Sequence, residues 1–109
     1  GSGDMLEVAH MGLHVAQMTS PAAMQQCFDA VTSAPARILQ LPGYGLAPGC
    51  HADFVLLQAR DCQEAIRLRA QRLVVVRRGK RIASTPAATA QLLLPGRPAK
   101  TDFMPDSAR

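Results

Sequence analysis

The stretch "GLAPGCHADFVLL", Gly45 to Leu57, decides how this chain is organised. A turn rich in Gly and Pro leads into a short apolar run, which predicts a buried β-strand over Phe54 to Gln58. Asp53 stands directly before this strand. An acidic side chain at such a corner accepts hydrogen bonds from N–H groups of the preceding turn. Gly45 and Gly49 would supply its unusual backbone angles. We therefore interpret Asp53 as a structural residue.

Three helices are expected before this turn. Residues Asp4 to Met18 are good helix formers with apolar side chains on several faces, so this helix should be buried on most sides. Ser20 and Pro21 mark the start of a second helix, Ala22 to Thr32. Ser33 is the expected cap of a short third helix around 35–40. The buried stripe of the second helix follows helical spacing and consists of Met24, Cys27, Phe28 and Val31.

A small β-rich region is expected after the turn. Residues 61–69 fit a short helix whose first residue, an aspartate, is its cap or a first-turn acid, with Cys62 on the apolar side. The β-branched run 72–78 predicts a strand, which a tight turn at Arg78 and Gly79 joins to a partner strand over 80–84. The apolar residues 92–94 predict a last strand.

Composition limits the functions that the chain can have. Of its 109 residues 48% are hydrophobic, which excludes an intrinsically disordered chain, and the formal net charge of +4 alone does not indicate nucleic acid. Its three cysteines contain no CxxC pair, so they indicate free thiols in a reducing, cytoplasmic setting. No apolar run is long enough to span a bilayer, so no membrane partner is expected.

Glu7, His10 and His14 are the candidates for a metal site. They are spaced i, i+3 and i+7 on the first predicted helix, and two histidines four residues apart lie on one face and can share a metal. The alternative is a hydrogen-bonded pair of histidines on a packed helix. Cys50 and His51 are adjacent, and their side chains would diverge along an extended chain, so they do not form a catalytic dyad.

Basic residues crowd the region between residues 60 and 81, with eight basic side chains against two acidic ones. A basic hairpin over Arg72–Arg81 could bind phosphates or another partner. Aromatic side chains for base stacking are missing there, and outer faces often carry such charges for solubility. Nucleic acid is therefore not the expected partner, although a stand-alone α+β module that binds through this hairpin stays an alternative.

The central turn resembles the C-terminal signature of the amidohydrolase superfamily. Gly45, Leu46, Gly49, Ala52 and Asp53 all fall on this signature, and "RLVVVRRGKRIAST" resembles the hairpin of the superfamily with Gly79 and Lys80 in place. Upstream, "VTSAPARILQL" is similar to a helix of the same superfamily. The first segment, "GSGDMLEVAHMGLHVAQM", resembles the corresponding helix of bacterial cytosine deaminases.

This resemblance implies an α+β fragment of a larger enzyme. Residues 1–40 would be the last helices of a (β/α)₈ barrel, and residues 41–94 the C-terminal strands of a small, composite β-sandwich. Residues 95–109 would form an extended or disordered tail. Copies of the isolated chain are expected to associate through exposed helix faces and strand edges, which the remainder of the parent chain would otherwise cover.

The resemblance also implies an activity for the parent protein. It would be a metal-dependent hydrolase of non-peptide C–N bonds that removes an exocyclic amine from a pyrimidine or related ring and releases ammonia. The ligands of the zinc or iron ion would be an HxH pair of histidines and an Asp, and they would precede Gly1. The residues that recognise the base would also precede Gly1. This chain would then hold no catalytic or substrate-binding residue and no cofactor, and would be inactive alone.

Overall fold

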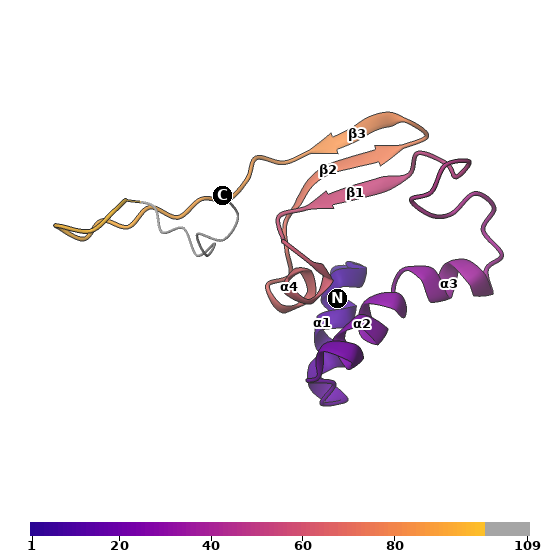
Figure 1. Ribbon diagram of the computed structural model, residues 1–109, viewed down its shortest axis with the longest axis horizontal. Helices are drawn as coiled ribbons and strands as arrows, with labels where there is room; N and C mark the ends of the chain where they lie inside the picture. Colours follow the sequence, from indigo (N-terminus) through magenta and orange to yellow (C-terminus); the bar gives the residue numbers. More distant parts are fainter. Residues whose placement is uncertain (100–109) are drawn as a thin grey trace.

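The structure is a computed structural model, and it describes residues 1–99. These residues form a small α+β unit in which a sheet lies on one side and the helices on the other (Figure 1). The sheet is antiparallel with strand order β1-β2-β3. In chain order the elements are α1 (Met5–Val15), α2 (Pro21–Asp29), α3 (Ser33–Ile38), β1 (Phe54–Leu57), α4 (Cys62–Arg67), β2 (Arg72–Arg77) and β3 (Lys80–Ser84).

Side-chain caps begin three of the helices. The predicted caps Ser20 and Asp61 are confirmed, because they accept hydrogen bonds from backbone N–H groups of α2 and α4 at 3.2 and 2.8 Å. Asp4 caps α1 in the same way. The prediction for Ser33 was wrong, since α3 begins at this residue and Thr32 occupies the cap position. The Thr32 hydroxyl donates instead to the Phe28 carbonyl.

The hydrophobic core lies among α1, α2 and α4. Its centre is Ile66 of α4, which is fully buried, and the small side chains of Ala9 and Ala65 allow the helices to approach closely. Cys27 is buried, whereas Cys62 is half-buried. The whole core cluster consists of Leu6, Ala9, Leu13, Cys27, Ala65, Ile66 and Ala70. The core therefore joins helices from both sides of the central turn.

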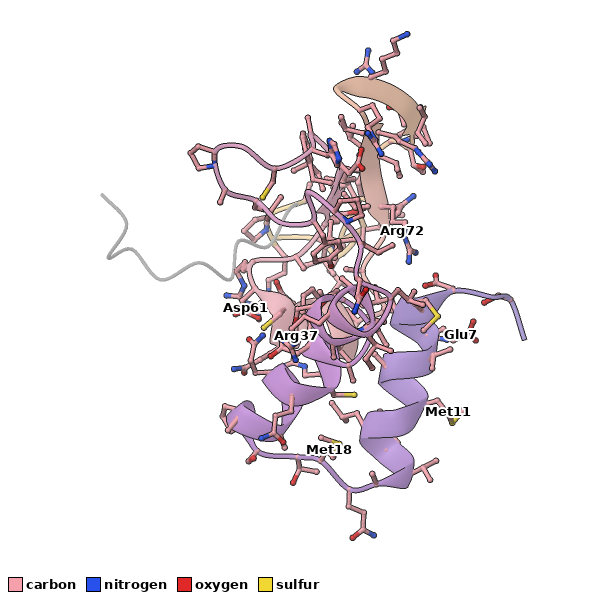
Figure 2. The ribbon with its side chains drawn as sticks, turned by 90° about the vertical axis from the view of Figure 1, so that its right-hand side faces the viewer. Glu7, Met11, Met18, Arg37, Asp61 and Arg72 are labelled. Carbon is pink, nitrogen blue, oxygen red and sulfur yellow. The ribbon has the colours of Figure 1, made fainter. Side chains whose placement is uncertain are left out.

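The described residues cover only one face of α1. Leu6, Ala9 and Leu13 point into the core, but Met11 is 61% exposed and Val15 is 77% exposed. In Figure 2 the labelled Met11 projects away from the rest of the molecule. The expectation that this helix is buried on most sides is thus wrong for residues 1–99, in which α2 and α4 are the elements that pack most extensively against it.

The sheet is a hairpin with one added strand. β2 and β3 meet at the predicted turn of Arg78 and Gly79, both with positive φ (49° and 74°), as a two-residue type I′ turn requires. β1 pairs antiparallel with β2. The prediction that β1 is buried was wrong: Leu56 is 51% exposed. Within the described residues, the core contacts this strand only at Leu57.

No strand forms over 92–94, in contrast to the prediction. The chain leaves the sheet after β3 and extends away from the body (Figure 1). The Leu92 N–H donates to the Ala99 carbonyl at 2.9 Å, so this segment folds back on itself. Pro95 and Gly96 favour a turn there, and Pro95 has no N–H for a ladder. Of the predicted tail, residues 100–109 lie outside the described residues.

Candidate functional site

An apolar groove of about 870 Å³ lies between the sheet and the helices. One wall is the sheet, the other is formed by α1 and the residues around the end of α2, and the loop that follows α3 closes one side. The side chains that line it include Met5, Leu6, Phe28, Val31, Tyr44, Val55, Val75 and Ile82. The charged or polar side chains of His51, Asp53, Arg72, Arg77 and Arg78 also line the groove, but its surface is mostly apolar and is therefore suited to packing against another apolar surface.

Asp4 and Arg72 form an ion pair beside this groove. The two terminal nitrogens of the Arg72 guanidinium donate to the two carboxylate oxygens of Asp4 at 2.6 and 2.7 Å. These hydrogen bonds lower the pKa of Asp4 to about 2, and the backbone N–H of Leu6 contributes further. Figure 2 shows Arg72 between the sheet and the first turn of α1. The pair thus joins the start of β2 to the start of α1.

Asp53 lies at the opposite end of the sheet. Its Oδ1 accepts a hydrogen bond from the Arg78 backbone N–H at 2.5 Å, and the Arg78 side chain approaches Oδ2 at 3.6 Å. The carboxylate therefore binds the turn between β2 and β3, whereas the sequence had led us to expect a bond to the preceding turn. Gly79 adds a backbone bond to the Ala52 carbonyl at 3.0 Å. Lys80 is exposed at the start of β3.

The glycine-rich turn is organised around His51. The His51 N–H donates to the Gly43 carbonyl at 2.7 Å, and the imidazole lies where a Gly43 side chain would be. Gly43 also has a positive φ of 66°. Gly45 and Gly49 have φ values of 137° and 93°, so their expected backbone angles are confirmed. The Cys50 thiol donates to the Tyr44 carbonyl within the same turn.

The structure does not bring Glu7, His10 and His14 together as a metal site. The His14 ring donates through Nδ1 to the His10 carbonyl at 2.7 Å, and the two imidazoles lie 4.4 Å apart. Glu7 instead accepts a hydrogen bond from the Ser2 hydroxyl. The pKa of His10 is lowered, chiefly by burial and then by the neighbouring His14. Among residues 1–99, no three His, Cys, Asp or Glu side chains are grouped to hold a metal ion.

Sequence reasoning missed Arg72, Gly43 and the hydrogen-bonding role of His51. Arg72 was visible only as one of many basic residues, because its partner lies 68 positions earlier in the chain. The sequence shows His51 only as the neighbour of Cys50, because no local pattern indicates its hydrogen bond to Gly43. Within the described part of the chain, no helix has the length and apolar character needed to cross a membrane.

The chain matches the model of the Amidohydrolase family over residues 1–84. This match includes all seven helices and strands described above. The chain belongs to the amidohydrolase family. No curated protein matches it.

The chain is also similar to solved structures of a deaminase and of an aminohydrolase. The chain is similar to 5-methylcytosine deaminase from Klebsiella pneumoniae liganded with 5-fluorocytosine, with 35% identity over 84% of this chain and a TM-score of 0.78. It is also similar to N-isopropylammelide isopropylaminohydrolase from Burkholderia multivorans ATCC 17616, with 37% identity over 77% of the chain and a TM-score of 0.73. The chain spans 22% of the length of each of these structures.

Proposed function

We propose that this chain is the C-terminal part of an aminohydrolase that acts on a cytosine-like ring. In the proposed reaction, water adds to the ring carbon that bears the exocyclic amine, the C–N bond breaks, and ammonia leaves. The observation that carries the proposal is the 35% identity to a 5-methylcytosine deaminase, over 84% of this chain. The similarity to an isopropylaminohydrolase supports the broader class, hydrolysis of an amine on a nitrogen heterocycle.

In this proposal the chain has a structural role within the parent enzyme. Residues 1–40 supply the last helices of a (β/α)₈ barrel and residues 41–94 supply strands of a β-sandwich. The apolar groove and the exposed faces of α1 and β1 support this assignment, because such surfaces need a cover that residues 1–99 do not provide. Asp53, Gly45, Gly49, Ala52, Gly79 and Lys80 then act as structural residues of the sandwich.

A divalent metal, zinc or iron, is part of the proposal for the parent enzyme only. The described residues of this chain do not fit a metal, since Glu7, His10 and His14 are not grouped as ligands. The catalytic residues and those that bind the heterocyclic base would therefore belong to the rest of the parent, and the isolated chain would be inactive.

The free thiols of Cys27, Cys50 and Cys62 support a reducing, cytoplasmic location.

An activity assay of the full-length parent tests the proposal. The metal-loaded protein should release ammonia from at least one of cytosine, 5-methylcytosine, isoguanine and creatinine, or isopropylamine from N-isopropylammelide. The isolated 109-residue chain, assayed in parallel, should release neither amine. A parent that is folded and metal-loaded but inactive on every aminated ring would overturn the proposed function.

A further inference from the structure

We propose that Asp4 and Arg72 are positioning residues for the reaction, because their ion pair fixes the segment that enters α1 against the β-sheet. This inference rests on the proposed function, since it takes α1 as a barrel helix. It assigns no chemistry to either side chain. Their role is to hold a neighbouring backbone segment in place.

The geometry of the pair supports a fixed arrangement. Two parallel N–H···O bonds, at 2.6 and 2.7 Å, restrict both the distance and the orientation of the two groups. Oδ1 of Asp4 also accepts the Leu6 N–H at 2.8 Å, so the same carboxylate caps the helix. Arg72 therefore holds the first turn of α1 itself rather than a mobile side chain.

The bonds continue into the residues before the helix. The Asp4 N–H donates to the Ser2 hydroxyl at 3.2 Å, and this hydroxyl in turn donates to Glu7. Residues 2–7 are thus linked to one another and, through Asp4, to the first residue of β2. A displacement of β2 relative to α1 would move this whole segment.

The location of the segment connects it to catalysis. In (β/α)₈ barrels the active site is built from the loops that join the carboxyl end of each strand to the following helix. The residues directly before a barrel helix belong to such a loop. If α1 is a barrel helix, residues 1–4 lie at this catalytic end, and small displacements there are costly for the reaction.

Hydrogen exchange in the 109-residue chain tests the structural half of the inference. Asp4→Asn removes the charge but keeps a side chain that can cap α1, and Arg72→Gln removes the other partner. Each should speed amide exchange at residues 5–8 by about fivefold. Glu64→Gln breaks the local ion pair with Arg60 and is the matched control, which should leave exchange at residues 5–8 unchanged. Unchanged exchange in both test variants would overturn the proposal.

Kinetics of the full-length parent test the catalytic half. Asp4→Asn and Arg72→Gln should each lower kcat by about tenfold while KM changes little, because positioning rather than substrate binding is lost. The double variant should be no worse than either single variant, and Arg72→Lys should recover part of the loss. If kcat per folded enzyme is unchanged while the melting temperature falls, the pair is merely structural and the inference is wrong.

The two experiments separate this inference from the proposed function. A wild-type parent that is inactive on every ring would overturn the proposed function and, with it, the catalytic half of the inference. Faster exchange at residues 5–8 would still support the structural half. An active parent whose kcat is insensitive to both substitutions would overturn the positioning role and leave the proposed function intact.

Discussion

The carboxylate of Asp53 holds the backbone N–H of Arg78, 25 residues further along the chain, at 2.5 Å. This bond joins the start of β1 to the turn that connects β2 and β3, and the Gly79 N–H strengthens the junction through the Ala52 carbonyl. All three strands therefore meet at one end of the sheet. The acid of the central turn and the glycine of the basic hairpin, which are separate features in the sequence, form one hydrogen-bonded junction.

Asp53→Ala should destabilise the chain without a direct effect on chemistry. The Arg78 N–H would lose its acceptor, but water can replace it because the Asp53 side chain is 45% exposed. We therefore expect a loss of about 1 kcal/mol in the free energy of unfolding, measured by urea denaturation. Asp53→Asn keeps an acceptor oxygen and should cost less. A parent enzyme that keeps its stability but loses turnover on Asp53→Ala would contradict this structural role.

The stability of the chain should fall in acid through Asp4. Its pKa is about 2 in the folded chain against an ordinary value of 3.8, so the ion pair with Arg72 stabilises the fold above about pH 4. This contribution is lost as the pH falls from about 4 to 2. Both side chains are more than a third exposed, which limits the effect to about 1 kcal/mol.

Urea denaturation at a series of pH values measures this effect. Asp4→Asn should reduce the acid dependence, because the titrating group is gone while the cap remains. Asp61→Asn makes the same change at the cap of α4, leaves the Asp4–Arg72 pair intact and is the matched control. Equal acid dependence in wild type and Asp4→Asn would show that the ion pair does not stabilise the fold.

Gly43→Ala should be more destabilising than Gly49→Ala. Both positions have positive φ, but a Cβ at Gly43 would collide with the His51 ring, whereas Gly49 has open space around it. We expect losses of about 2 and about 1 kcal/mol, respectively, in the free energy of unfolding. In a His51→Ala background the extra cost of Gly43→Ala should disappear. Equal costs in the wild-type background would mean that the ring does not restrict this turn.

The isolated chain should self-associate through its uncovered apolar surfaces. Burial of apolar surface contributes about 25 cal/mol per Å², so covering the exposed faces of α1 and β1 favours association. Analytical ultracentrifugation should show a sedimentation coefficient that rises with concentration. Met11→Gln with Val15→Lys should weaken this dependence, whereas Gln26→Glu on the exposed side of α2 should not. A chain that stays monomeric across the concentration series would refute the prediction.

The sequence by itself determined the local structure of this protein. Caps such as Ser20 and Asp61, the turn at Arg78 and Gly79, and the order of helices and strands depend on φ preferences and on hydrogen bonds between residues close in the chain. Each of these signals involves only a few neighbouring residues, so the sequence alone is enough to predict the local structure. The pattern of the central turn also indicated the amidohydrolase family, which the family match confirms.

Only the tertiary structure decided which distant residues meet. It places Ile66 of α4 between α1 and α2, pairs Asp4 with Arg72, and gives Asp53 a partner in the turn between β2 and β3. An apolar run such as β1 shows that burial is favourable, but whether the strand is covered depends on what other parts of the chain pack against it. Long-range pairing is decided by topology and packing, which no local pattern contains.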